Sequence, residues 1–268
     1  MDLVKDTTIK SLDLYNKGIG KVPTYVWQIF TLETLNLADN GLISLSKKIG
    51  NLSHLTMLDL GHNKLSSVPE SLGRLTKLKF LYLSNNKLRT VPQSLWKLKK
   101  LVYLNITDNQ LTSLPEDMGQ LSNLIELRLY NNQLISLPNS IGRLKNLLEL
   151  HVMGNRLQSL PEPIGRLSKL RKLMLEGNKI EVLPASLGDL QNLTDLDLRN
   201  NQVRTIPDSI GKLKSLRFLD LRANQLTELP AAIARLQKLE KLDLRWNHSL
   251  AIPAWIAKLE ERGCIVYT

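Results

Sequence analysis

The chain has 268 residues, of which 43% are hydrophobic, and a formal net charge of +11. It contains no run approaching the ~18 apolar residues of a membrane-spanning helix, and its start, MDLVKDTTIK, lacks the apolar stretch of a secretory signal. Its one cysteine, Cys264, cannot form an intramolecular disulfide, which favours a reducing compartment and predicts a cytoplasmic protein.

A repeat of 23 residues runs along nearly the whole chain. Beginning at Ile9 and then at a leucine every 23 residues from Leu32 to Leu239, eleven consecutive repeats share the pattern LxxLxLxxNxLxxLPxxIGxLxx. A fixed period of this length predicts a solenoid in which each repeat packs only on its neighbours. We therefore predict a short leader over residues 1–8, one solenoid domain over residues 9–261 and a C-terminal closing strand over residues 262–268.

Each repeat predicts the same elements in the same order. The first is a short strand, such as residues 103–108, where Leu104 and Ile106 share one face and polar residues the other. An asparagine follows at position 9 in ten repeats, and its amide can both donate to and accept from backbone groups at the turn. A proline at position 15 then fixes an extended return, and a short helical or irregular segment follows. The strands should stack in parallel with their leucines buried.

This pattern resembles the leucine-rich-repeat family, in particular its short-repeat intracellular group, which is found in bacterial proteins and in Ras-group scaffold proteins. The resemblance implies an α/β solenoid in the form of a horseshoe, with the parallel sheet on the concave face and short helical or irregular segments on the convex side. The pattern departs mainly at the ends, where Lys17 replaces the asparagine, Ser46 replaces the proline and Leu250 shifts the apolar position. Relatives often carry a kinase, GTPase or ubiquitin-ligase domain, so repeats alone imply recognition without catalysis.

Strand positions 3, 5, 7 and 8 have no part in the core and should project from the concave face. From the third to the eighth repeat they hold aromatic residues, methionine, histidine and arginine; aromatics, methionine and arginine are enriched at protein interfaces. We predict a partner-binding surface formed by Met57, Phe80, Tyr82, Tyr103, Arg128, Tyr130, His151, Met153 and Met174. The alternative is that these side chains only stabilise the sheet by stacking between strands.

From the ninth repeat onward the same positions form two charged rows. The rows consist of Asp197, Asp220 and Asp243 at position 5 and Arg199, Arg222 and Arg245 at position 7, with Phe218 and Trp246 beside them. Two interpretations remain open, a solvated surface that pairs with itself or a half-site that orients a partner. Without a deep pocket, we expect the ionisation of Asp195, Asp197 and Asp220 to stay ordinary.

The positive charge gathers at the return into each strand, at positions 20, 22 and 23. This basic rim includes Arg74, Lys97, Lys99, Lys100, Arg143, Lys145 and Arg166. Such a stripe can bind nucleic acid or anionic lipid. It also suits cations that follow short helical turns and keep a leucine-rich chain soluble, and no aromatic residues interleave with it.

Catalytic and metal-binding motifs are absent from the sequence. The four histidines are dispersed and Cys264 lies in the apolar tail GCIVYT, where burial is expected. We predict a non-enzymatic scaffold or adaptor, without a cofactor, that binds a protein or peptide on its concave face. Two alternatives are anion binding through the basic rim and an exported bacterial effector that blocks a host protein. The short leader also predicts weak self-association through the first strand.

Overall fold

The computed structural model describes residues 8–268, so residues 1–7 of the predicted leader lie outside the described part. The chain divides into two compact bodies. The N-terminal body contains residues up to 112 together with 117–132, and the C-terminal body contains residues 113–116 and 133–268.

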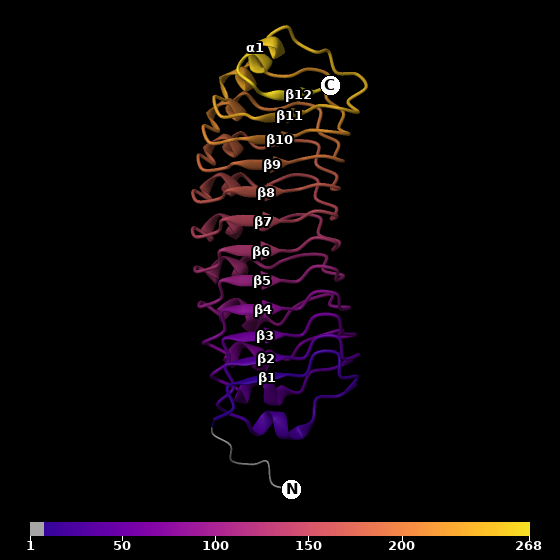
Figure 1. Ribbon diagram of the computed structural model, residues 1–268, viewed down its shortest axis with the longest axis vertical. Coiled ribbons are helices and arrows are strands. Elements are labelled where there is room, and N and C mark those ends of the chain that lie inside the picture. The colour runs from indigo at the N-terminus through magenta and orange to yellow at the C-terminus, as the bar shows by residue number, and fades with distance from the viewer. Residues whose placement is uncertain (1–7) are drawn as a thin grey trace. The chain divides into compact units, whose positions relative to one another are not determined.

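Each body contains a parallel sheet whose strands follow chain order (Figure 1). The strands of the N-terminal body are β1 (Ser11–Asp13), β2 (Thr34–Asn36), β3 (Met57–Asp59), β4 (Phe80–Tyr82), β5 (Tyr103–Asn105) and β6 (Glu126–Arg128). Those of the C-terminal body are β7 (Glu149–His151), β8 (Lys172–Met174), β9 (Asp195–Asp197), β10 (Phe218–Asp220), β11 (Lys241–Asp243) and β12 (Ile265–Tyr267). Residues at the same repeat position pair between neighbouring strands, as Tyr82 pairs with Asn105 and Leu219 with Leu242.

A five-residue 3-10 helix follows each of the first ten strands, and a short α-helix follows β11. The 3-10 helices are η1 (Thr24–Gln28), η2 (Lys47–Asn51), η3 (Glu70–Arg74), η4 (Gln93–Lys97), η5 (Glu116–Gln120), η6 (Asn139–Arg143), η7 (Glu162–Arg166), η8 (Ala185–Asp189), η9 (Asp208–Lys212) and η10 (Ala231–Arg235), and the α-helix is α1 (Ile256–Glu261). Prolines such as Pro69, with φ −73° and ψ 151°, precede these helices in an extended conformation, as predicted. Helices of neighbouring repeats pack so closely that a Cβ on Gly188 would lie 2.2 Å from the carbonyl oxygen of Ser209.

The leucines of the repeat pattern form the core. The middle residue of almost every strand is buried, for example Leu81 and Leu104 with no exposed surface, and the leucines of the return segments are buried with them. Burial of one such side chain contributes roughly 1.5 to 3 kcal/mol. These leucines therefore serve to stabilise the fold, as the sequence predicted. The first and third residues of each strand lie on the other face of the sheet, which no described segment covers.

The asparagines at position 9 of the repeats connect each repeat to the one before it. Asn86 donates from Nδ2 to the carbonyl oxygens of Leu60, Leu83 and Ser84 at 3.0 to 3.2 Å, and its Oδ1 accepts from the Leu65 N–H at 2.9 Å. All ten asparagines at position 9 are buried. The predicted structural role of this residue is confirmed.

The strands are shorter than the sequence predicted. β5 ends at Asn105 rather than continuing to residue 108, because the residue at position 8 of every repeat has a left-handed backbone conformation that cannot continue a strand. These residues are Asn16, Asp39, His62, Asn85, Asp108, Asn131, Gly154, Gly177, Asn200, Ala223 and Trp246. Positions 7 and 8 therefore lie in a turn after the strand.

Candidate partner-binding surfaces

An aromatic cluster of Tyr82, Tyr103 and Arg128 lies on the exposed sheet face of the N-terminal body. The rings of Tyr82 on β4 and Tyr103 on β5 are tilted by 39° with their centroids 5.0 Å apart. Arg128 on β6 places Cζ 5.8 Å from the centre of the Tyr103 ring and also pairs with Glu126. Partial burial raises the pKa of both tyrosine hydroxyls further above neutral pH.

The parallel register extends this cluster across the sheet. Met57 pairs with Phe80, which in turn pairs with Tyr103, and Phe80 is 39% exposed. Asp59 on β3 pairs with Tyr82 on β4, and burial raises the pKa of the Asp59 carboxyl group. Asp59 was not among the predicted surface residues, although it holds position 5 of the third repeat, as Tyr82 and Arg128 do in later repeats.

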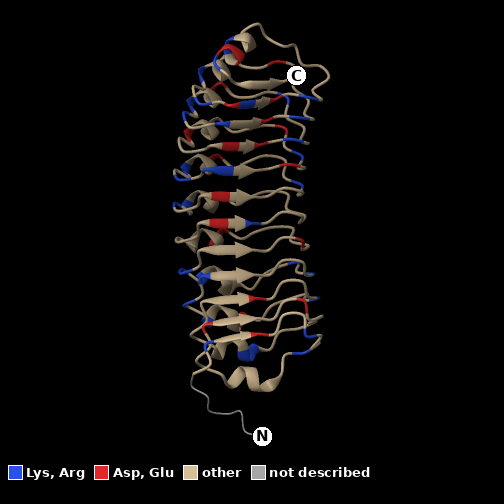
Figure 2. Cartoon of the chain, in the orientation of Figure 1, with Lys and Arg blue, Asp and Glu red and all other residues tan. Residues whose placement is uncertain are grey.

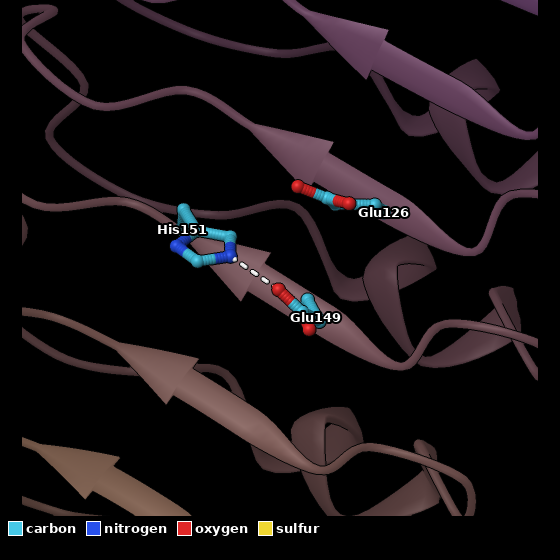
Figure 3. Close-up of side chains that lie close together, drawn as sticks. All are labelled: Glu126, Glu149 and His151. Atoms are coloured by element: carbon cyan, nitrogen blue, oxygen red, sulfur yellow. Dashed lines mark hydrogen bonds and ion pairs between the residues drawn. The ribbon is translucent and has the colours of Figure 1, made fainter.

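The predicted surface is divided between the two bodies. Tyr130, in the turn after β6, belongs to the N-terminal body, whereas His151, Met153 and Met174 belong to the C-terminal body. Tyr130 and these three residues are all partly buried. Figure 3 shows the His151 ring turned toward Glu149 on the same strand, with Nε2 and Oε2 3.0 Å apart.

Glu149 also accepts from Lys172 on the next strand, at 3.0 Å. Burial alone would raise the pKa of Glu149, but the hydrogen bonds from His151 and Lys172 outweigh it and hold the pKa below its usual value. Glu149, on β7, is thus a charged member of this face.

The charged rows pair with each other, but they are not solvated throughout. Asp243 has no exposed surface and accepts hydrogen bonds from Nε and Nη2 of Arg245 at 2.9 and 2.6 Å. Arg222 bonds Asp220 in the same way and lies 3.4 Å from Asp243. Burial would raise the pKa of Asp243, but Arg245 and Arg222 hold it below its usual value. The interpretation as a solvated surface is therefore wrong for this residue.

Asp197 contradicts the expectation of ordinary ionisation. Its carboxylate is buried, and this burial raises its pKa to about 6, with the neighbouring charges of Asp220 and Glu176 adding to the effect. Arg199 opposes the shift only in part, because its guanidinium is shared with Glu176, which lies 2.5 Å from Nη2.

A small cavity, also not expected, opens on the same face. It has a volume of about 190 Å³ and is lined by two leucines and by Met174, Asp195, Asp197, Phe218, Asp220 and Lys241.

Trp246 is an exposed residue in an unfavourable conformation. It has φ 63°, and 59% of its surface is exposed between Arg222 and Arg245, whose Cζ atoms lie 5.9 and 5.7 Å from the ring centre. A bulky residue in the left-handed region costs energy that an exposed ring does not recover by burial. The turn imposes this conformation, since position 8 of every repeat has a positive φ.

The basic rim is exposed in both bodies. Figure 2 shows lysine and arginine near the ends of the 3-10 helices, and Arg74 and Lys97 occupy the last turns of η3 and η4. No residue of the basic rim forms an ion pair with any described residue, although Lys145 donates from Nζ to the Arg166 carbonyl at 2.9 Å. These cations suit both the anion-binding interpretation and a role at the negative ends of the helical turns.

The family assignment follows from the repeat, the sheet and the asparagines together. A family model described as a leucine rich repeat matches residues 30–88, 69–111 and 99–157, and one described as a leucine-rich repeat region matches residues 185–261. The chain belongs to the leucine-rich-repeat family, and its predicted fold class is confirmed. A sequence search of curated proteins found no significant match.

Solved structures of the same fold include plant receptors and a domain of a bacterial protein. The plant peptide hormone receptor RGFR1 in complex with RGF2 shares 27% identity over 84% of this chain and 38% of its own, with a TM-score of 0.76. The functional domain of InlJ from Listeria monocytogenes shares 26% identity over 91% of this chain and 52% of its own, also at 0.76. The ectodomain of GASSHO1/SCHENGEN3 from Arabidopsis thaliana, in complex with CASPARIAN STRIP INTEGRITY FACTOR 2, shares 30% identity over 88% of this chain and 35% of its own, at 0.63.

The chain thus spans between about one third and one half of the length of these proteins. Among residues 8–268, no helix has the length and apolar character needed to cross a membrane.

Proposed function

We propose that the chain is a non-enzymatic scaffold or adaptor that binds a protein or peptide on the exposed sheet face of its N-terminal body. The observation that carries the proposal is the aromatic cluster, where Tyr103 contacts both Tyr82 and Arg128 on a face that folding leaves open. Tyrosine and arginine are the residue types that dominate binding energy at interfaces, and preorganised side chains lose little entropy on binding. The complexes of the similar receptors with RGF2 and with CASPARIAN STRIP INTEGRITY FACTOR 2 support this class of function.

The proposed setting is the cytoplasm. Cys264 is the only cysteine and is buried, and burial raises the pKa of its thiol, so it is neither a disulfide partner within the chain nor a reactive nucleophile. An exported effector that occupies a host protein would use the same surface. Weak self-association through β1, which pairs only with β2 among the described strands, stays a separate prediction.

Peptides selected from a random display library on the immobilised chain provide the test. We expect Tyr103→Ala to weaken their binding by at least ~30-fold, which corresponds to about 2 kcal/mol. The matched control is Tyr25→Ala, which removes a 38% exposed tyrosine of η1 in the same body, away from the sheet face. Circular dichroism checks that both variants fold. Selected peptides that bind both Tyr82→Ala and Tyr103→Ala as tightly as the original chain would exclude the proposal.

Anion binding by the basic rim is the second candidate, because seven exposed cations there have no ion-pair partner among the described residues. Binding of this kind weakens steeply with salt, since it releases counterions from the anion. Substitution of Lys97, Lys99 and Lys100 by glutamate should abolish it and leave peptide binding at Tyr103 intact. Affinity for RNA or anionic vesicles that is insensitive to salt would count against this candidate.

A further inference from the structure

The cavity on the exposed sheet face of the C-terminal body has the size of a site for one side chain. Its volume of about 190 Å³ lies below the ~300 to 1,000 Å³ of pockets that enclose small-molecule ligands. It is also several times the ~30 Å³ that one water occupies in the liquid. Because it opens on a face that no described segment covers, a side chain of a partner can enter it.

The polar part of the cavity is acidic. Asp195, Asp197 and Asp220 line it, against one cation, Lys241. Lys241 is committed elsewhere, since its Nζ lies 5.1 Å from the centre of the Tyr267 ring and 4.0 Å from Asp243. Asp220 is already held by Arg222. Asp195 and Asp197 are therefore the carboxylates available to an incoming cation.

Neither of these two carboxylates has a full counter-charge of its own. The one side-chain partner of Asp197 among the described residues is Arg199, whose Nε lies 3.2 Å away but makes no hydrogen bond of acceptable geometry. The same guanidinium pairs with Glu176 through Nη2. Asp195 accepts only from the neutral hydroxyl of Thr194 among the described residues. A buried carboxylate with half a counter-charge favours any additional donor that reaches it.

The apolar part of the cavity distinguishes between cations. Met174 and Phe218 form walls beside the carboxylates, and Phe218 already has the Cζ of Arg217 5.3 Å from its ring centre. A guanidinium is planar, stacks on aromatic rings and donates in a fixed fork to carboxylates, whereas an ammonium is strongly hydrated and lacks this geometry. The combination of a stacking wall and two adjacent carboxylates suits arginine better than lysine.

We propose that the cavity between β8 and β11 binds an arginine side chain of a protein partner, with its guanidinium on Asp195 and Asp197 and its methylene stem against Met174 and Phe218. This inference extends the proposed function, because it supplies a charge-specific subsite to a scaffold whose other contact surface is aromatic. It specifies a basic partner for the half-site interpretation of the charged rows. The excess positive charge of the rest of the chain does not oppose it, since the Debye length is only ~8 to 10 Å at physiological salt.

An NMR titration tests the subsite without any knowledge of the partner. The probes are N-acetyl-arginine amide and N-acetyl-citrulline amide, which have nearly the same shape but differ in charge. We expect saturable shifts of the backbone amides of β9 and β10 with the arginine probe, with a Kd on the order of millimolar. The citrulline probe should bind at least tenfold more weakly. Asp195→Asn combined with Asp197→Asn should reduce arginine binding at least tenfold.

Two further variants keep the outcome interpretable. Asp208→Asn, in η9 of the same body, removes an acidic residue outside the cavity and should leave the titration unchanged. Phe218→Ala removes the apolar wall at a partly exposed position without altering a carboxylate, and should weaken arginine binding severalfold. Equal binding of the two probes, or an absence of shifts in β9 and β10, would overturn the inference.

The subsite and the proposed function can fail separately. Tyr103→Ala should leave the arginine titration unchanged, because Tyr103 lies in the other body. If arginine fails to bind while selected peptides still depend on Tyr103, only the subsite is wrong. If arginine binds and no peptide depends on Tyr82 or Tyr103, only the proposed function is wrong.

Discussion

Asn109 donates a hydrogen bond from its side-chain Nδ2 to the carbonyl oxygen of Leu83, 26 residues earlier, at 2.9 Å. The same amide accepts from the Leu88 N–H through Oδ1 at 2.9 Å, so a single buried side chain satisfies a donor and an acceptor of the preceding repeat. The backbone groups it serves have no access to water.

Replacement of this asparagine should therefore destabilise the chain strongly. We expect Asn109→Ala to lower the free energy of unfolding by at least ~2 kcal/mol, because each buried polar group left without a partner costs about 1 to 3 kcal/mol. Urea denaturation followed by circular dichroism measures the change. Asn123→Ala removes an exposed asparagine that donates one bond to the Lys99 carbonyl, and should cost less than ~1 kcal/mol. Equal effects would contradict the role assigned to the buried amide.

Asp197 should make stability depend on pH in the opposite sense from a typical salt-bridged carboxylate. Its pKa rises from 3.8 to about 6 on folding, so the folded state holds the proton more tightly than the unfolded state does. Its contribution is favourable below pH ~4 and is lost as the pH rises through 6. Asp197→Asn should consequently increase the unfolding free energy by ~1 to 3 kcal/mol at pH 7.5, at 1.36 kcal/mol per pKa unit, and by much less at pH 4.

Asp243, on β11 of the same sheet face and two strands from Asp197 on β9, provides a matched control. It is buried like Asp197, but its pKa is lowered because Arg245 and Arg222 are its partners. Asp243→Asn should destabilise the chain at neutral pH, since it leaves two guanidinium groups short of a counter-charge. Urea unfolding of both variants at several pH values between 4 and 8 tests the pair. A stabilising Asp243→Asn, or a destabilising Asp197→Asn at pH 7.5, would show that these environments are misassigned.

Ala223 has a conformation that alanine disfavours, with φ 51° at position 8 of its repeat. Nine of the eleven residues at this position are asparagine, aspartate, histidine or glycine, which tolerate the left-handed region. We expect Ala223→Asn to raise the free energy of unfolding by ~0.5 to 1 kcal/mol, because the strain on a residue with a Cβ is ~1 to 2 kcal/mol and asparagine relieves part of it. The urea midpoint measures this gain.

Ala223→Val supplies the opposite arm of that experiment. A β-branched side chain is still less compatible with positive φ and should lower the midpoint. A gain in stability from valine would mean that strain at position 8 does not limit this turn.

The period of the sequence predicted the fold because each repeat position meets one environment. Leu104 is buried and Asn86 bonds to the preceding repeat for the same reasons that their equivalents do in other repeats. The left-handed turn was also present in the sequence as a column of asparagine, aspartate and glycine, but Ala223 and Trp246 obscured it. Trp96 interrupts another column, since it is buried at the position that glycine holds in most repeats.

The chemistry of the exposed face was harder to predict, because a long charged side chain can reach several partners and the sequence does not show which of them it contacts. The sequence places Arg199 beside Asp197, yet only the structure shows that its guanidinium also serves Glu176 in the preceding repeat. That division leaves Asp197 with a raised pKa and a cavity beside it. The aromatic cluster was predicted more fully, because Tyr82 and Tyr103 occupy adjacent positions of a regular ladder.

The direction of the asparagine bonds bears on how the protein is made. Each amide closes the turn of the repeat that precedes it, as Asn63 does when its Oδ1 accepts from the Leu42 N–H and its Nδ2 donates to the Leu37 carbonyl. During translation, the turn of a repeat therefore lacks these asparagine hydrogen bonds until the next repeat has left the ribosome. Nascent chains should acquire protease resistance one repeat behind the exit tunnel, in steps of a single repeat.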